Sequence, residues 1–329
     1  MIAVVGAAGT IGRKVVEFLQ GWGAPARSLD FRYERADHVD ARDVSSVARA
    51  LDGAAVCVNC ADYRLNLEVM RGALTAGTHY VDLGGLFHMT RRQLELDGDF
   101  RAAGLTGILG MGSAPGKTNL LARAAVERLA AEPRRLEIWA ATRDPGAAGH
   151  PFPAPYSVQT LLDELRMEPM IVADGELQPV EPLSGEAERE FPEPVGRAKG
   201  IYTLHSELAT LPDAYPTLHE ASFRLCLTPG LLDGLLALKD EDEYPEPYVQ
   251  SPASVAVHLV EAANGGGRQV VGMTVTSGGS ARSTSEPAAR AAVELAEGRL
   301  STPGVHPPEI AIPDPERFLA LLDTHVKFS

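Results

Sequence analysis

The feature that most restricts the fold of this chain is a glycine-rich turn near its start, in the sequence MIAVVGAAGTIGRKVVEFL. Its glycines lie three residues apart, between a β-branched run at residues 2–5 and apolar residues that recur at helical spacing. Glycine lets the backbone approach phosphate groups closely, and the N-terminus of the following helix attracts anions. We therefore predict a strand–turn–helix unit that holds a dinucleotide pyrophosphate, although a βα turn without ligand shares the pattern. The predicted contacts are Gly6, Gly9, Thr10, Ile11 and Gly12.

A second strand-like segment, ARSLDFR, carries an acid at its end. Asp30 lies near the spacing at which a carboxylate binds the adenosine ribose hydroxyls. A carboxylate there would repel the 2′-phosphate of NADP, so we expect NAD to be favoured over NADP. Arg32 is the competing feature, because its guanidinium could pair with that phosphate.

Length and charge restrict the class of protein. With 329 residues, 45% of them hydrophobic, the chain is long enough for two packed domains. The formal net charge of −14 disfavours nucleic acid and anionic membranes as partners. No apolar run reaches the roughly 18 residues of a membrane span, and the first strand leaves no room for a signal peptide, so we expect a cytoplasmic protein. The three cysteines are too few for a disulfide framework.

The order of elements indicates two domains. Up to residue 117, strand-like and helical segments alternate, which predicts a doubly wound parallel sheet of six strands in an α/β fold. Within it, Thr90 and Gln93 have the spacing of a capping box at a helix start. Beyond about residue 132, longer alternating segments such as RRLEIWAAT and RQVVGMTVT, with a hairpin-like turn at Asp174, predict a second α+β domain with a mixed or antiparallel sheet. The stretch 181–199 is expected to be a loop or flap.

Four stretches together resemble the saccharopine dehydrogenase family, including its lysine dehydrogenase-like and carboxynorspermidine dehydrogenase-like members. They are GAAGTIG, AGTHYVDLGGLFH, GMGSAPGKTNLLA and GVHPPE. The resemblance implies a Rossmann domain made of residues 1–117 with 285–329, and a substrate-binding domain at 118–284 that also forms a homodimer. It further implies nicotinamide-dependent redox chemistry at a C–N bond. Residues 112–116 depart from the acidic LDPG of saccharopine-forming members, so saccharopine itself is not expected as the substrate.

Ligands of parallel sheets bind beyond the carboxyl ends of the strands, which selects the candidate residues of the first domain. Asp82 ends the strand HYVD and is followed by Gly84, where backbone could approach a nicotinamide. Asp82 could orient the carboxamide or relay a proton, or it could fix the loop by accepting backbone N–H groups. Cys60 and Ala61 follow the strand-like AAVCVNC and are expected to contact the cofactor through their backbone.

Three further residues are candidates for substrate chemistry. His205 and Glu207 are two apart, hence on one face of a strand, where they could tune a proton donor or simply share a structural hydrogen bond. Arg224 alternates with apolar residues, and an inward arginine needs a carboxylate from the substrate or from an internal salt bridge. Lys117 falls in the first turn of a helix after Pro115, where we expect it to bind the substrate carboxylate with Asn119 nearby.

These residues favour an oxidoreductase that moves a hydride between NAD or NADP and an amino-acid-like substrate, as amine to imine or the reverse. No metal is expected at the site. A short-chain dehydrogenase is disfavoured because none of the eight tyrosines has a lysine four residues later. A semialdehyde dehydrogenase would need a nucleophilic cysteine, and Cys226 in an apolar strand is a poor candidate. A reductase of another carbonyl or imine metabolite, or a redox sensor that binds the cofactor without turnover, remain the alternatives.

Overall fold

The computed structural model describes residues 1–150, 152–238, 241, 243–245 and 248–329, and it divides the chain into two compact units. The first unit comprises residues 1–117 and 284–314. The second comprises residues 118–283 and 315–329. Each unit is thus made of two separate stretches of chain, and each is described by itself.

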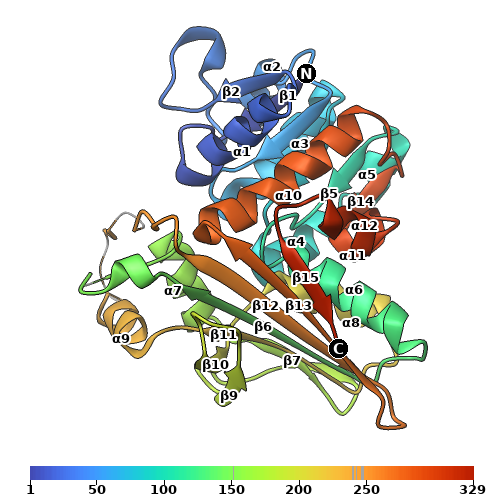
Figure 1. Cartoon of the computed structure of the whole chain (residues 1–329). Coiled ribbons are helices and arrows are strands. Elements are labelled where there is room, and N and C mark those ends of the chain that lie inside the picture. The colour runs from blue at the N-terminus through green and yellow to red at the C-terminus, as the bar shows by residue number, and fades with distance from the viewer. Residues whose placement is uncertain (151, 239–240, 242, 246–247) are drawn as a thin grey trace. The chain divides into compact units, whose positions relative to one another are not determined.

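The first unit contains a six-stranded parallel sheet with the order β14-β5-β4-β3-β1-β2 (Figure 1). The strand bounds are β1 Ile2–Val5, β2 Ala26–Leu29, β3 Val56–Asn59, β4 His79–Asp82, β5 Thr106–Ile108 and β14 Gly304–His306. Strands β1 and β3 are buried on both faces, as parallel strands covered by helices require. The predicted parallel sheet is confirmed, but the sixth strand comes from the C-terminal part of the chain instead of from the first 117 residues.

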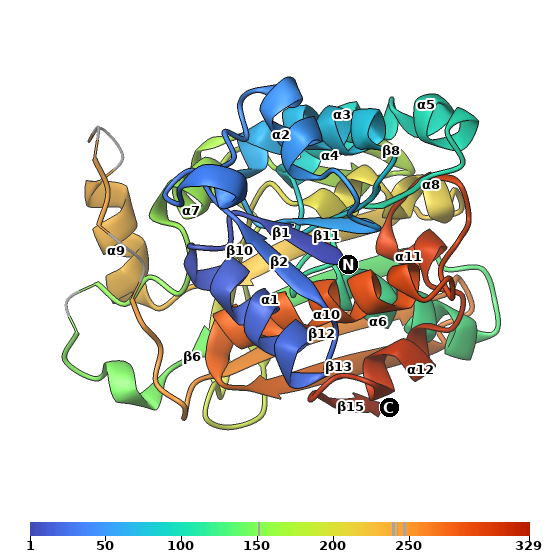
Figure 2. The ribbon, with the colours of Figure 1, turned by 90° about the horizontal axis from the view of Figure 1, so that it is seen from above.

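Helices cover both faces of this sheet, with α2 and α3 on one side and α1 and α10 on the other (Figure 2). Their bounds are α1 Thr10–Gly21, α2 Val44–Ala50, α3 Asn66–Ala76, α4 Leu86–Leu94, α5 Asp97–Ala102, α10 Gly279–Ala296 and α11 Pro308–Ala311, with short 3₁₀ turns at Arg35–Asp37 and Tyr63–Leu65. The Ser285 hydroxyl donates to the carbonyl of Ile11, which joins α10 to α1. The C-terminal segment up to residue 314 therefore completes the first unit.

One helix boundary differs from the sequence prediction, and another helix contains an interior proline. Helix α4 begins at Leu86, so Thr90 and Gln93 lie inside it and form no capping box. The Gln93 side chain instead donates to Asp82, which explains why a polar residue is buried here. Helix α10 begins at Gly279 and contains Pro287 in its interior, so the proline does not mark its start.

The second unit contains a nine-stranded mixed sheet along the path β15-β13-β12-β6-β11-β10-β9, with β7 and β8 beside β11. The strand bounds are β6 Arg135–Arg143, β7 Met170–Ala173, β8 Glu176–Pro179, β9 Ala187–Glu190, β10 Arg197–Tyr202, β11 Glu220–Cys226, β12 Val255–Ala263, β13 Gln269–Ser277 and β15 His325–Phe328. The helices are α6 Lys117–Leu129, α7 Val158–Arg166, α8 Leu211–Ala214, α9 Pro229–Ala237 and α12 Pro315–Ala320, with 3₁₀ turns at Pro145–Ala147 and Ser206–Ala209. Among the strands that the structure describes in this unit, β6 and β11 pair in parallel and the other pairs are antiparallel, so the predicted mixed sheet is confirmed.

Of the local predictions for the second unit, one is confirmed and one is wrong. The hairpin between β7 and β8 forms where expected, with Asp174 and Gly175 both at positive φ, as a tight two-residue turn requires. The stretch 181–199 is not simply a loop, because it contains β9 and the start of β10, which pair antiparallel. Strand β12 was not anticipated.

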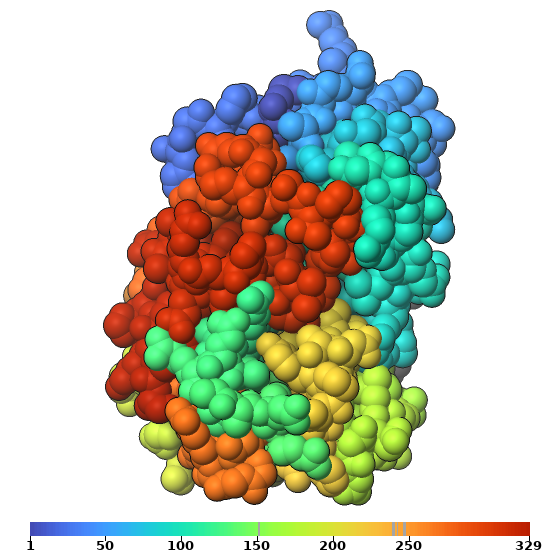
Figure 3. All heavy atoms as spheres, turned by 90° about the vertical axis from the view of Figure 1, so that its right-hand side faces the viewer, coloured from blue at the N-terminus to red at the C-terminus, as the bar shows by residue number. Residues whose placement is uncertain are grey.

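The last fifteen residues correct the predicted domain boundary. Residues 285–329 were assigned to the first domain, but 315–329 belong to the second unit, where β15 pairs antiparallel with β13. Glu316 forms an ion pair with Arg128 of α6, whose guanidinium also lies over the ring of Phe328. Figure 3 shows these dark red C-terminal residues beside the green end of α6. Among the described residues, no helix has the length and apolar character needed to cross a membrane.

Candidate functional site

A cavity of about 400 Å³ lies at the carboxyl ends of β1, β2 and β3 in the first unit. Six predicted cofactor-binding residues line it, namely Gly6, Gly9, Asp30, Arg32, Cys60 and Ala61. The other lining residues are Val5, Phe31, Val39, Asp40, Ala41, Arg42, Asp62 and Leu65. Thr10, Ile11 and Gly12 form the first turn of α1 beside this cavity instead of its lining.

The glycine turn is tight enough that only glycine fits it. Gly6 has φ +79°, and a Cβ added there would lie 2.7 Å from the backbone of Cys60. A Cβ at Gly12 would lie 2.2 Å from the carbonyl oxygen of Gly6. Helix α1 has no side-chain cap at Gly9 and no acidic residue in its first turn, so its N-terminal amides and partial positive charge have no anionic side chain of their own. This cradle fits the diphosphate of a dinucleotide.

The edge of the cavity where a ribose would lie holds an aspartate–arginine pair. Asp30 is buried and accepts the backbone N–H groups of Ala8 and Arg32 and the Nε of Arg32, each at 3.0 Å. Burial opposes ionisation, but these hydrogen bonds and the Arg32 charge lower the pKa of Asp30 below its ordinary value. A second such pair, Asp40 with Arg42 at 2.8 Å, lines the same cavity and was missed, because no strand-end rule selects a loop residue.

Asp82 lies outside this cavity, in a buried polar network. Its carboxylate accepts the backbone N–H groups of Gly84 at 3.0 Å and Gly110 at 2.6 Å, and the side chains of Gln93 and Tyr80. Burial raises the pKa of Asp82 despite these bonds. Asp82 and Gly84 thus have the geometry of the loop-fixing alternative, since the carboxylate ties together the loops after β4 and β5. A direct role at the nicotinamide stays a prediction.

Lys117 is the first residue of α6, and its backbone N–H donates to the carbonyl of Gly112 at 3.1 Å. Pro115 therefore precedes the helix instead of occupying its first turn. The Lys117 side chain is fully buried, as is Asn119 two residues further on. A contact of Lys117 with the substrate carboxylate stays a prediction.

The second unit brings His205 and Glu207 together, although not on a strand. His205 follows β10 in a loop, Glu207 lies in the 3₁₀ turn, and His205 Nδ1 is 2.9 Å from Glu207 Oε2. Glu164 of α7 lies on the other side of the imidazole, with its Oε1 3.7 Å from Nε2, and the ring stacks on Phe223. Burial lowers the pKa of His205, but the charge and hydrogen bond of Glu207 outweigh it, and the net shift is upward.

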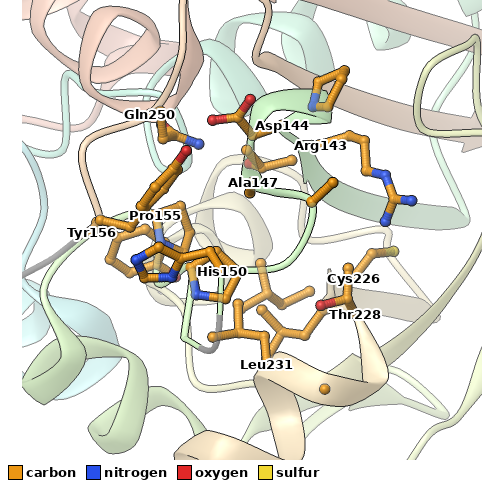
Figure 4. Close-up of a pocket in the computed structure, with 18 residues that line it drawn as sticks. Arg143, Asp144, Ala147, His150, Pro155, Tyr156, Cys226, Thr228, Leu231 and Gln250 are labelled. Carbon is orange, nitrogen blue, oxygen red and sulfur yellow. The ribbon is translucent and has the colours of Figure 1, made fainter.

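A cavity of about 310 Å³ adjoins this cluster, and Tyr156 belongs to both (Figure 4). The Tyr156 hydroxyl donates to Glu164 Oε2 at 2.7 Å. Arg143, Asp144, Cys226 and other residues complete the lining. Burial raises the pKa of the Cys226 thiol to about 12, which makes it a poor nucleophile, as the sequence indicated. Tyr156 and Glu164 were missed because they meet His205 only through tertiary contacts.

Arg224 is buried, and its partners are neutral. Its guanidinium donates to the Gly185 carbonyl and to the hydroxyls of Ser222 and Tyr202, and it lies against the rings of Trp139 and Tyr202. Within the described part of the chain it has no carboxylate partner, so the internal salt bridge is not found. Arg224 does not line the cavity at Tyr156. Its contacts fasten the segment at Gly185 to the sheet, and a substrate contact stays a prediction.

Comparison with known proteins matches residues 29–108 to the family described as the saccharopine dehydrogenase NADP binding domain. The carboxyaminopropylagmatine dehydrogenase of a Synechocystis species is 26% identical over 221 residues, which cover 63% of this chain and 55% of that protein. The match thus spans about half the length of this curated relative.

Two solved structures resemble the whole chain in fold. Saccharopine dehydrogenase (L-Glu forming) from Saccharomyces cerevisiae has a TM-score of 0.69 at 14% identity, covering 100% of this chain and 99% of that one. Homospermidine synthase from Legionella pneumophila, solved in complex with NAD, has a TM-score of 0.70 at 11% identity, covering 100% and 91%. At these identities the likeness concerns the fold alone. Residues 29–108, from the end of β2 to the end of β5, are therefore similar to the saccharopine dehydrogenase NADP binding domain, and the chain has the saccharopine dehydrogenase fold.

Proposed function

We propose that the protein is a nicotinamide-dependent oxidoreductase that acts on a C–N bond of an amino-acid-like substrate. The observation that carries the proposal is the cavity of the first unit, whose glycine cradle and Asp30–Arg32 pair fit a dinucleotide and whose lining lies mostly within the matched family segment. The carboxyaminopropylagmatine dehydrogenase relative supports a CH–NH group as the position oxidised.

Different residues of the protein would bind the cofactor, handle the proton and bind the substrate carboxylate. The glycine turn and the first turn of α1 would hold the diphosphate of a nicotinamide dinucleotide, and that cofactor would supply the hydride chemistry. Oxidation of an amine to an imine also releases one proton from nitrogen, and reduction of an imine takes one up. His205, hydrogen-bonded to Glu207, is the candidate for handling that proton. Lys117 is the candidate for binding the substrate carboxylate.

We propose that NAD is preferred over NADP, because the Asp30 carboxylate lines the ribose edge of the cavity and its lowered pKa keeps it charged. The homodimer and the cytoplasmic location stay predictions from the sequence. Saccharopine as the substrate remains unexpected, since residues 112–116 lack the acidic residue of saccharopine-forming members.

Turnover assays test the proposal. The protein is mixed with NADH or NADPH and pairs of an amine and a carbonyl compound, and with NAD or NADP and secondary-amine amino acids, while absorbance of the reduced nicotinamide is followed. We expect turnover with at least one amino-acid-like pair, and none from a Gly12→Val variant, whose cradle is filled. Tight NADH binding without turnover on any pair would instead support a redox sensor.

A further inference from the structure

A line of polar side chains connects the cavity of the second unit to its buried interior. Tyr156 lines the cavity, is half-buried, and donates its hydroxyl to Glu164 at 2.7 Å. Glu164 lies 3.7 Å from His205, which in turn lies 2.9 Å from Glu207. Thr118 closes the line with a 2.6 Å bond to Glu207. The cavity surface therefore reaches three buried titratable groups through a single hydroxyl.

The buried end of this line carries more acids than bases. Glu164 and Glu207 flank His205, and Asp163 lies next to Glu164 on α7. All four residues are less than a tenth exposed. Glu164 and Glu207 bring two carboxyl groups to one imidazole in these buried surroundings, which favours keeping an extra proton beside His205. Burial raises the pKa of Glu164 to about 7, which identifies Glu164 as the group that holds it.

The cavity lining also includes an acid and aromatic rings, which suit a positively charged ligand. Asp144 lines it and accepts the Ser251 amide at 2.7 Å and the Gly146 amide at 2.8 Å, and these bonds, acting against burial, lower its pKa and keep it ionised. His150 and Tyr248 contribute rings whose centroids are 4.6 Å apart. Arg143, a cation of the described lining, lies on the opposite side of the cavity from Tyr156 in Figure 4.

We propose that the Tyr156 side of this cavity binds an ammonium or guanidinium group, and that this binding expels a proton from the Glu164–His205–Glu207 cluster. The ligand N–H donates to the Tyr156 oxygen while the Tyr156 O–H continues to donate to Glu164. The new positive charge then lies within about 6 Å of Glu164, a distance at which an opposite charge favours the carboxylate form. The proton passes to solvent, and no covalent bond to the ligand forms.

Calorimetric binding of n-butylguanidinium to the full-length protein, without cofactor, tests this. Measurements near pH 7 in two buffers of different ionisation enthalpy give the number of protons released. We expect a net release of protons, less than one per bound cation, because burial raises the pKa of Glu164 to about 7. The uncharged probe n-butanol should release none. Glu164→Gln should still bind the cation but release no proton, whereas Glu168→Gln, an exposed acid just beyond α7, should behave as the unmodified protein.

The inference is overturned if n-butylguanidinium and n-butylammonium both fail to bind, if they bind without proton release, or if Glu164→Gln releases as much as the unmodified protein. Should Glu164→Gln fail to fold, Tyr156→Phe tests the same link between the cavity and Glu164. This variant keeps the ring and removes the hydroxyl that joins the cavity to the acid, so it should release no proton. The inference rests on the proposed function only in treating this cavity as the substrate pocket. Binding and proton release are read without cofactor, so this claim and the proposed turnover fail separately.

Discussion

Asp30 and Asp82 both end a strand of the same parallel sheet, yet their carboxyl groups meet opposite environments. Asp30 lines a cavity and is paired with Arg32, so its pKa is lowered, whereas Asp82 is enclosed and burial raises its pKa. Their position at the end of a strand can be predicted from the sequence. The environment of each carboxyl group depends on side chains from other elements, such as Gln93. The strand-end rule therefore finds candidate residues without assigning their chemistry.

The Asp30–Arg32 pair should control the choice of cofactor. We expect the unmodified protein to bind NADH more tightly than NADPH. Arg32→Ala leaves the Asp30 charge uncompensated, so it should weaken NADPH binding by about tenfold or more, the value of one charge-assisted hydrogen bond, with little effect on NADH. Fluorescence titration with both cofactors measures this. Arg101→Ala, which breaks an ion pair with Asp97 outside the cavity lining, is the control. Tighter binding of NADPH by the unmodified protein would contradict the expected preference.

Lys117→Met tests the proposed carboxylate contact. Methionine keeps the apolar stem in a fully buried position and removes the charge. Loss of an ionic contact to the substrate should lower kcat/KM by on the order of a hundredfold, while the Kd for the cofactor stays nearly constant. Steady-state kinetics and a cofactor titration on the same preparation separate the two effects. Unchanged kcat/KM would remove Lys117 from the site.

Glu164→Gln should reduce the pH dependence of stability. Burial raises the pKa of Glu164 from 4.5 to about 7, so between these values the folded chain holds a proton that the unfolded chain has lost. The free energy of unfolding therefore falls as pH rises through this window, by at most about 3 kcal/mol. His205, whose net pKa shift is upward, contributes in the same direction above its ordinary range. Urea unfolding at about pH 5 and about pH 8 measures the difference, and a slope equal to that of Glu168→Gln would count against the assignment.

At the scale of elements, the short buried strands of the first unit were the most predictable parts. Apolar runs such as IAVV in β1 and VCVN in β3 leave no alternative to a strand covered on both faces. Strands β9 and β15 were missed because polar and apolar residues share them, with a burial pattern that alternates between half-buried and exposed. Such edge strands are specified by their partner strand more than by their own sequence.

The turn before α1 allows a sharp test of backbone fit. Gly12→Ala would place a Cβ 2.2 Å from the Gly6 oxygen, so the turn must shift. Its backbone N–H groups would then no longer point toward the diphosphate. We expect NADH binding to weaken by about tenfold or more, since one charge-assisted hydrogen bond is worth ~1.5–3 kcal/mol. Gly21→Ala, at the end of the same helix, meets no atom within 4 Å and should leave binding unchanged. Equal affinities for the two variants would contradict a diphosphate site at this turn.

At the scale of the whole molecule, each unit is closed by a distant part of the chain. The first sheet receives β14 at residues 304–306, and the second receives β15 at 325–328. The family segments at both ends of the sequence predicted that the first domain would be completed from the C-terminus. The sequence could not show at which residue the C-terminal segment leaves the first unit, because α12 has an apolar face that either unit could cover.

Two truncations separate the roles of β14 and β15. A chain that ends at residue 284 lacks β14, so we expect it to be insoluble or unable to bind NADH. A chain that ends at residue 314 keeps β14 and loses β15, so it should bind NADH but show a lower Tm, because the edge of β13 is left unpaired. Solubility, NADH titration and thermal unfolding report the outcome. A well-folded, cofactor-binding chain of residues 1–284 would refute the first expectation.

The pairing of β14 with β5 also bears on the order of events during synthesis. Thr106 of β5 donates to the carbonyl of Thr302, 196 residues later in the chain. At a ribosomal rate of about 5–20 residues per second, the edge of β5 therefore waits for roughly 10–40 s before its partner exists. An unpaired parallel edge is a template for other chains. Nascent copies on one messenger RNA would expose this edge to one another. We therefore expect the yield of folded protein to rise when translation initiates slowly and when chaperones that bind open sheet edges are supplied.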